Sequence, residues 1–258
     1  MLSISRPNYI KCSFTREDQA THGLYTGLLD IFFAETKDLI IRYPDIKKYI
    51  SFDEQLKADK FHFDDDRETY VLCHALLRLV LANHLNVNPL EIKFKIGLNN
   101  KPCLTNDAVY FNVTHTKEAF SFAVSKNFYV GIDLEDINQP VEINSIAESF
   151  FSKREREYIF KSNTDAKNRF FLLWTRKEAL LKAIGTGISD NLTQIEVSEQ
   201  ENYINKKSFE NLVLDSVSDE HFIYSMNFKN YSLSIAVPGK VTINLYHLNI
   251  ESINLYLD

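Results

Sequence analysis

Cysteine, glycine and proline are all scarce in this chain of 258 residues, which contains 3 Cys, 7 Gly and 6 Pro. So little glycine and proline excludes a collagen-like or linker-dominated protein. Cys12, Cys73 and Cys103 form no CxxC pair. This count excludes a disulfide framework and a zinc knuckle, and it is typical of a protein in a reducing cytosol. We therefore expect a cytoplasmic protein.

Long apolar segments and an excess of positive charge are also missing. No charge-free apolar run reaches roughly 18 residues, so no membrane span is expected, and the N-terminal segment lacks the apolar core of a signal peptide. The 29 basic and 35 acidic residues give a net charge of −6. No global positive field would hold nucleic acid or an anionic membrane, so a phosphate site must be a local cluster of basic side chains.

The rest of the composition is that of a folded protein. Hydrophobic residues make up 45% of the chain and charged residues 25%, which excludes a disordered chain. At roughly 150 residues per domain, the length allows one large or two small domains.

Hydrophobic periodicity predicts where helices and strands lie. Apolar residues recur at helical spacing from Thr69 to Leu85, after an acidic stretch, Asp64–Asp66, that suits a helix N-terminus. A later helix over Phe170–Ile184 is apolar nearly all round, so we expect it to be largely buried. Further helices are expected over Ile143–Phe151 and Lys153–Phe160, and strands over Glu91–Ile96, Tyr110–Thr114, Phe120–Val124, Tyr129–Leu134, Ile195–Val197, Phe222–Phe228, Ser232–Val237 and Val241–Leu248.

A short internal echo indicates two related halves. FSFAV at Phe120–Val124 resembles LSIAV at Leu233–Val237, and each is the late strand of a helix-then-strands series. We therefore predict an α+β fold with two similar halves in a pseudo-twofold arrangement, residues 1–130 and residues 131–258.

The strongest local signal is the acidic sequence GIDLED at Gly131–Asp136. Residues two apart in a strand share a face, so Asp133 and Glu135 project together while Ile132 and Leu134 point into the core. Two adjacent carboxylates repel each other unless a cation or a proton lies between them. The alternative interpretation is a strand end that runs into a solvated acidic loop.

The expected buried helix carries charges that match this strand. Thr175, Glu178 and Lys182 fall within an arc of about 60°. A surface ion pair between Glu178 and Lys182 is the alternative, but a charged pair on a mostly buried helix needs further partners. A hard cation shared by Asp133, Glu135 and Glu178 would provide them. Carboxylate oxygens, waters and substrate phosphate oxygens form the octahedral shell that Mg²⁺ prefers.

A third polar cluster, FNVTHT at Phe111–Thr116, ends an alternating strand. His115 lies between the hydroxyls of Thr114 and Thr116, as a strand end that contacts phosphate could. The alternative is a histidine that is simply satisfied at the surface or in the core.

Five ordered motifs run along the chain. They are NKP (Asn100–Pro102), FNVTHT (Phe111–Thr116), GIDLED (Gly131–Asp136), FFSKRE (Phe150–Glu155) and WTRKEALLKAIGTGI (Trp174–Ile188). This series resembles that of the 4′-phosphopantetheinyl transferases of the surfactin-synthetase-activating type. The resemblance covers residues 50–190 well, continues weakly through the final hairpin and is absent from residues 1–45.

The resemblance implies a Mg²⁺-dependent transferase. It would move 4′-phosphopantetheine from coenzyme A to a serine of an acyl or peptidyl carrier protein and release adenosine 3′,5′-bisphosphate. The implied metal ligands are Asp133, Glu135 and Glu178. The implied coenzyme A contacts are Lys57, Arg67, Lys101, Pro102, Thr114, His115 and Lys182. The implied catalytic residues are Glu178 as a candidate base, Lys182 on the phosphate, and His115, which we expect to bind phosphate as a donor.

Three departures from the family pattern accompany this resemblance. Thr114 and Thr116 stand where serine is usual, Asn100 replaces glycine, and Glu54 stands where some members carry a second lysine.

Two other functions fit the acidic cluster: a Mg²⁺-dependent nucleotide phosphohydrolase and an inactive coenzyme A-binding module that docks carriers. We expect a monomer, because two internal halves could build the cleft in one chain. The basic residues Lys153, Arg154 and Arg156, beside Phe150 and Phe151, are a candidate carrier-docking surface; a solvated helix start is the alternative.

Overall fold

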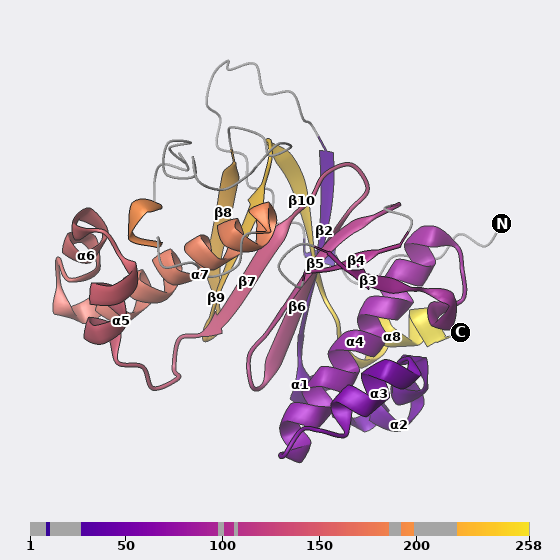
Figure 1. Cartoon of the computed structure of the whole chain (residues 1–258). Coiled ribbons are helices and arrows are strands. Elements are labelled where there is room, and N and C mark those ends of the chain that lie inside the picture. Colours follow the sequence, from indigo (N-terminus) through magenta and orange to yellow (C-terminus); the bar gives the residue numbers. More distant parts are fainter. Residues whose placement is uncertain are drawn as a thin grey trace.

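The computed structural model of this chain describes residues 9–10, 27–97, 101–105, 108–185, 192–198 and 221–257 (Figure 1). Two sheets lie back to back in its centre, and helices cover the outer face of each sheet. The fold is therefore α+β, as predicted. Within the described ranges, no helix is both long and apolar enough to span a bilayer.

The first sheet is five-stranded, in the order β1-β10-β2-β6-β5. Its neighbours are antiparallel except β10 and β2, which run parallel. Its strands are β1 (Tyr9–Ile10), β10 (Val241–His247), β2 (Gly27–Glu35), β6 (Ala119–Ser125) and β5 (Tyr110–His115). The helices of this half are α1 (Thr36–Leu39), α2 (Tyr43–Ile46), α3 (Phe52–Ala58), α4 (Asp64–Leu85) and α8 (Ile250–Leu257), and a small hairpin pairs β3 (Phe94–Ile96) with β4 (Pro102–Leu104).

The second sheet is antiparallel, in the order β7-β9-β8. Its strands are β7 (Gly131–Asp136), β9 (Tyr231–Val237) and β8 (Phe222–Phe228). The long helix α7 (Ala166–Ile184) packs across β7 and β9, with α5 (Ile143–Phe150) and α6 (Lys153–Ile159) beside it. Each half thus places one long helix on a sheet, which agrees with the predicted pair of similar halves.

The two strands that echo each other in sequence occupy equivalent places. β6 is central between β2 and β5, and β9 is central between β7 and β8. Both contribute to the apolar core between the sheets, where Ala123 and Leu233 are fully buried with Ile31 and Ile132. The similar sequences therefore reflect similar surroundings, with a strand neighbour on both sides.

Two expectations from periodicity need correction, and some elements were not predicted. The chain over Glu91–Ile96 begins as a 3-10 turn, Pro89–Glu91, and becomes a strand only at Phe94. Ile195–Val197 is not a strand, because the Val197 amide donates to the side chain of Glu155 instead of to a sheet. The helix α8 was not expected. With β10, it packs on the core of the first half. The division after residue 130 stays a prediction.

Gly131 allows α7 to lie directly on β7. A Cβ atom at this position would lie 1.9 Å from the carbonyl oxygen of Ala179 and 2.3 Å from the amide nitrogen of Ala183, both in the backbone of α7. Only glycine permits so close an approach of helix and strand. The crossing brings the C-terminal turns of α7 onto the acidic strand.

Candidate active site

The acidic strand and α7 meet in a charged pair. Asp133 is 5% exposed on the face of β7, while Ile132 and Leu134 are buried between the sheets, as the alternation predicts. Lys182 Nζ donates to Asp133 Oδ1 at 2.6 Å and to the carbonyl oxygen of Ile132 at 3.2 Å. Helix and strand therefore contribute one partner each to this pair.

The carboxylates around this pair are incompletely neutralised. In the part of the chain that the structure describes, Asp133 Oδ2 and Glu178 Oε1 are buried without a hydrogen-bond partner. Burial and the charges of Asp133 and Glu135 raise the pKa of Glu178 to about 7. Burial also raises the pKa of Asp133, and burial with the charge of Asp133 raises the pKa of Glu135. A bound cation or added protons would therefore reduce the repulsion between these carboxylates and stabilise the site.

A hard divalent cation matches these donors. All three side chains offer carboxylate oxygens, the ligand type that Mg²⁺ takes, and two of those oxygens lack another partner. In this structure, no choice of one carboxylate oxygen from each of Asp133, Glu135 and Glu178 places all three oxygens within 4.8 Å of one another. The three carboxylates would have to converge to coordinate one ion together.

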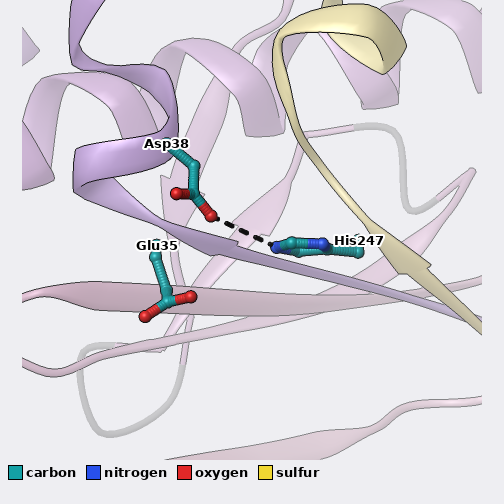
Figure 2. A group of neighbouring side chains, drawn as sticks. All are labelled: Glu35, Asp38 and His247. Atoms are coloured by element: carbon teal, nitrogen blue, oxygen red, sulfur yellow. Dashed lines mark ion pairs between the residues drawn. The ribbon is translucent and has the colours of Figure 1, made fainter. Parts of the chain in front are cut away.

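Another group among the described residues does satisfy that limit: Glu35, Asp38 and His247 (Figure 2). His247 Nε2 lies 3.6 Å from Asp38 Oδ2. Glu35, however, already forms ion pairs with Lys37, at 3.0 Å, and with Lys229. These ammonium groups supply the positive charge, so we assign the group a structural role at the end of β2.

Two side chains that sequence reasoning missed hold Glu135. Gln139 Nε2 donates to Glu135 Oε2 at 2.6 Å, and the Trp174 side chain also donates to this carboxylate. Trp174 opens the last of the five motifs, so its position was visible in the sequence. Gln139 lies in a loop without a motif, and only the folded chain places it.

A cleft of about 1020 Å³ opens between the two halves beside these carboxylates. Phe63, Tyr70 and His115 line it from the first half, and Glu135 and Gln139 line it from the second. The first half also lines the cleft with Asp65, Asp66 and Glu118, so aromatic and acidic side chains share that wall, while the wall of the second half is polar and acidic.

At the end of β5, His115 lines this cleft, and other basic groups lie near it. Partial burial and the nearby His74, Lys182 and Lys57 lower the pKa of His115. Lys57 Nζ lies 5.3 Å from the ring centroid of Tyr70. The structure thus brings Lys57, His115 and Lys182 near one another, as a local anion site requires.

Three predicted coenzyme A contacts lie elsewhere. Arg67 forms an ion pair with Asp64 at 2.5 Å and is not part of the cleft lining, whereas Thr69, two residues further on, is. The ammonium of Lys101 donates to the main-chain carbonyl of Val130, directly before β7, and to that of Lys182 in α7. Pro102 is exposed at the start of β4. Their predicted contacts with the nucleotide stay predictions.

Side chains of β5 attach it to β7, which belongs to the other sheet. Asn112 Oδ1 accepts the Ile132 amide at 2.9 Å. The Thr114 hydroxyl accepts the Leu134 amide at 3.2 Å and donates to Asp133 Oδ1 at 3.3 Å. Thr114 therefore orients the acid, and its predicted contact with coenzyme A stays a prediction.

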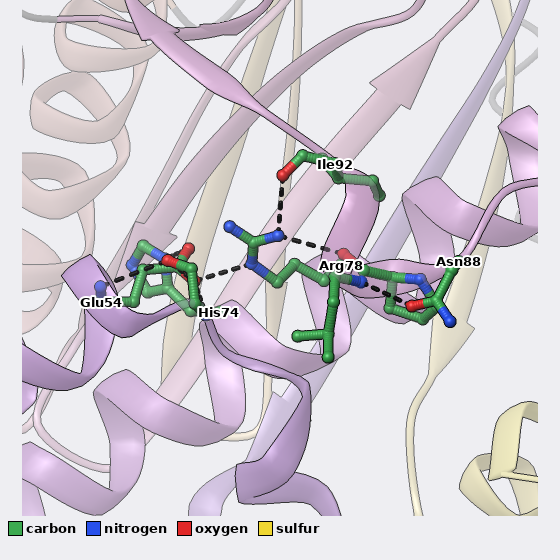
Figure 3. Close-up of polar contacts among 8 residues, drawn as sticks. Glu54, His74, Arg78, Asn88 and Ile92 are labelled. Atoms are coloured by element: carbon green, nitrogen blue, oxygen red, sulfur yellow. Dashed lines mark hydrogen bonds and ion pairs between the residues drawn. The ribbon is translucent and has the colours of Figure 1, made fainter.

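Glu54, which replaces a lysine of some relatives, points into the fold (Figure 3). Its carboxylate accepts Arg78 Nε at 2.7 Å and lies 3.2 Å from His74 Nδ1, and Arg78 continues to the carbonyl oxygen of Ile92 at 2.9 Å. Although burial opposes it, hydrogen bonds from His74, Ser51 and Arg78 lower the pKa of Glu54 to about 2. This network fastens α3 to α4.

The candidate docking segment at α6 is only partly exposed. Lys153 and Arg154 are exposed and Phe150 and Arg156 are half-buried, but Phe151 is 1% exposed and belongs to the core of the second half. Glu155 pairs with the buried Lys177 at 2.8 Å. A surface contact by Phe151 was wrong, and carrier docking on the basic residues Lys153, Arg154 and Arg156 stays a prediction.

Comparison with known proteins defines the class to which this fold and site belong. A family model of the 4′-phosphopantetheinyl transferase superfamily matches residues 129–236, and a model of the 4′-phosphopantetheinyl transferase N-terminal region matches residues 42–130. The chain belongs to the 4′-phosphopantetheinyl transferase superfamily, a family of transferase enzymes, as the five motifs predicted.

Curated relatives cover much of the same region. The 4′-phosphopantetheinyl transferase HetI of Nostoc sp. is 33% identical over 60% of this chain and 67% of its own length. The 4′-phosphopantetheinyl transferase Sfp of Bacillus subtilis is 29% identical over 55% of this chain and 62% of its own. The chain thus spans about two thirds of these relatives. A holo-acyl-carrier-protein synthase structure from Thermotoga maritima has a TM-score of 0.32 and 19% identity, covering 42% of this chain and 61% of that one.

Proposed function

We propose that this protein transfers 4′-phosphopantetheine from coenzyme A to a serine hydroxyl of an acyl or peptidyl carrier protein, with Mg²⁺, and releases adenosine 3′,5′-bisphosphate. The observation that carries the proposal is the Asp133–Lys182 pair at the crossing of β7 and α7, beside buried carboxylate oxygens that lack a partner among the described residues. Family membership supports the same reaction class.

Asp133, Glu135 and Glu178 would hold the metal ion, which when bound would neutralise charge on the pyrophosphate oxygens. The chain's own residues prepare this arrangement. Thr114 and Lys182 orient Asp133, and Gln139 orients Glu135. These hydrogen bonds restrict Asp133 and Glu135 before substrate arrives, and binding of the ion would draw the three carboxylates together.

The transfer step forms a bond between the serine oxygen and the phosphorus that carries pantetheine. The bond from that phosphorus to the bridging pyrophosphate oxygen breaks, and its electron pair stays on the leaving bisphosphate. The serine proton passes to Glu178, our candidate general base, whose carboxylate keeps a buried oxygen without a hydrogen-bond partner among the described residues. Lys182 donates to the phosphate oxygens on which charge develops.

Basic groups at and beside the cleft would bind the rest of coenzyme A. His115 in the cleft and Lys57 beside Tyr70 would face its phosphates, and Phe63 and Tyr70 would border the less polar parts. Because Glu54 is directed inward to Arg78, we expect fewer cations around the 3′-phosphate than in relatives that carry lysine there.

The test is incubation with coenzyme A, Mg²⁺ and a panel of apo carrier proteins, scored by the intact mass of the carrier. We expect a phosphopantetheine mass gain on at least one carrier, at a strongly reduced rate in Lys182→Ala. Release of adenosine bisphosphate without a carrier would indicate a phosphohydrolase. Binding of coenzyme A without release would indicate an inactive docking module.

A further inference from the structure

The side chain of Lys101 reaches from the first half of the molecule to the main chain of the second. Lys101 lies directly before β4 in the small hairpin of the first half. Its Nζ donates to the carbonyl oxygen of Val130 at 3.1 Å and to that of Lys182 at 2.5 Å. The sequence gives no reason to expect a lysine here to bridge the two halves.

Both acceptors lie where α7 crosses β7. Val130 directly precedes Gly131, the residue on which the backbone of α7 rests. Lys182 lies in the last turn of α7, where main-chain carbonyls have no partner inside the helix. The carbonyl oxygen of Leu181 accepts a hydrogen bond from the Gly185 amide. The next carbonyl oxygen, that of Lys182, accepts one from Lys101. A positive charge is also favourable at a helix C-terminus.

Lys182 is therefore held at both of its ends. Its carbonyl accepts from Lys101, and its ammonium donates to Ile132 and Asp133. Burial lowers the pKa of Lys101 to about 8, with a further contribution from Lys182. This ammonium is not a freely solvated surface charge.

We propose that Lys101 is a positioning residue for the transfer reaction, one that fastens the last turn of α7 to the start of β7 and so holds the Lys182 side chain against Asp133. The inference rests on the proposed function. It differs from a contact with the nucleotide, because a positioning residue affects turnover through Lys182, whereas a ground-state contact affects the Michaelis constant for coenzyme A.

Kinetics of Lys101→Met separate these roles. The free energy of hydrogen bonds from a charged donor corresponds to roughly a tenfold or larger factor in rate. We therefore expect kcat to fall about tenfold, while the Michaelis constant for coenzyme A changes less than about threefold. Lys101→Arg, which can still donate to two carbonyls, should recover part of kcat. Lys93→Met, at an exposed lysine beside the same hairpin, is the matched control and should leave both constants unchanged.

A double-mutant cycle tests whether Lys101 acts through Lys182. We expect Lys101→Met to lower the residual kcat of Lys182→Ala by less than about twofold, because the group it positions is already gone. A full tenfold loss in that background, or a raised Michaelis constant with unchanged kcat, would overturn the proposal.

Hydrogen exchange gives a readout that does not depend on activity. Lys101→Met should speed exchange at the amides of residues 181–185 and leave those of α4 unchanged. If the wild type transfers nothing to any carrier, the proposed function fails, and this measurement still decides whether Lys101 fastens α7. Unchanged exchange over residues 181–185 would refute the inference. If Lys101→Met does not fold, Lys101→Gln takes its place in all three experiments.

Discussion

The pKa values of the buried Glu54 and the half-buried Glu178 are shifted in opposite directions by their surroundings. Glu54 accepts hydrogen bonds from Ser51, His74 and Arg78, which lower its pKa to about 2. Glu178 has a buried oxygen without such a partner in the described chain and faces Asp133, so its pKa rises to about 7. The first carboxylate stabilises the fold, and the second is available for chemistry.

The depressed pKa of Glu54 makes part of the stability depend on pH. Its folded pKa lies below the ordinary glutamate value of 4.5, so the contribution is present above about pH 4.5 and is lost as the pH falls toward about 2. We expect Glu54→Gln to lower the free energy of unfolding by about 1–2 kcal/mol at neutral pH, after allowance for solvent screening. The difference from wild type should shrink near about pH 3. Urea unfolding measures both, with the exposed Glu148→Gln as control.

The raised pKa values at the acidic site have the opposite sign. A carboxyl whose folded pKa is raised contributes stability at low pH, and that contribution is lost as the pH rises through about 7 for Glu178. A bound cation offsets the repulsion, and its binding displaces protons. We therefore expect Mg²⁺ to raise Tm more at about pH 8 than at about pH 6.

Asp133→Asn shows whether this effect comes from the proposed site. It removes a ligand charge but keeps the shape, so it should lose most of the Mg²⁺-dependent rise in Tm and nearly all transfer activity. A Mg²⁺ response equal to that of wild type would place the ion elsewhere.

At the scale of elements, the contact of α7 with β7 sets the geometry of the site. Gly131→Ala would place a methyl group against the backbone at Ala179 and Ala183, which cannot rotate away. We expect a loss of about 3 kcal/mol or more, at the upper end of overpacking costs, with loss of activity as Glu178 and Lys182 move off the strand. Thermal unfolding and transfer assays measure the two effects.

Gly185→Ala is the matched control for that substitution. Gly185 ends α7 with φ +73°, and a Cβ atom there would meet nothing within 4 Å. Its cost should be about 1 kcal/mol, from backbone strain alone. Equal losses of unfolding free energy for the two substitutions would mean that α7 and β7 can move apart to make room for a methyl group.

Periodicity predicted most elements, because burial repeats every two or 3.6 residues in strands and helices. The partners of an element depend on contacts that are distant in sequence. Alternation identifies Val241–Leu248 as a strand, yet nothing in it indicates pairing with β2. Ile195–Val197 alternates as well, but its amide bonds to Glu155.

The site shows the same division. The spacing of residues on β7 and α7 predicted that Asp133, Glu178 and Lys182 share one site. In the structure, Lys182 forms an ion pair with Asp133. Lys101, Thr114 and Gln139 were assigned otherwise or missed, because each acts through a bond to another element.

At the scale of the whole molecule, the last strand and helix complete the first half. Ile243, Leu245 and Tyr246 of β10 are buried, as is Ile253 of α8. We expect removal of residues 241–258 to unfold the first half and to lose the circular dichroism of α4. The single tryptophan, Trp174, lies in α7, so its emission reports on the second half separately.

A shorter truncation serves as the control. Removal of residues 250–258 leaves β10 in place and should lower Tm without unfolding α4. If the longer truncation keeps the helix content of the first half and loses only Trp174 packing, the assignment of β10 to the first half is wrong.

The pairing of β2 with β10 also dictates an order of events during synthesis. Asp30 and Asn244, which join the two strands by a side-chain hydrogen bond, are 214 positions apart. Contacts so distant form slowly because a long loop must close first. The strands and helices of the second half lie between Gly131 and Val237, so a ribosome releases all of them before β10. The second half can therefore fold before the first is complete, while the edge of β2 that later pairs with β10 stays open to a chaperone or to another nascent chain.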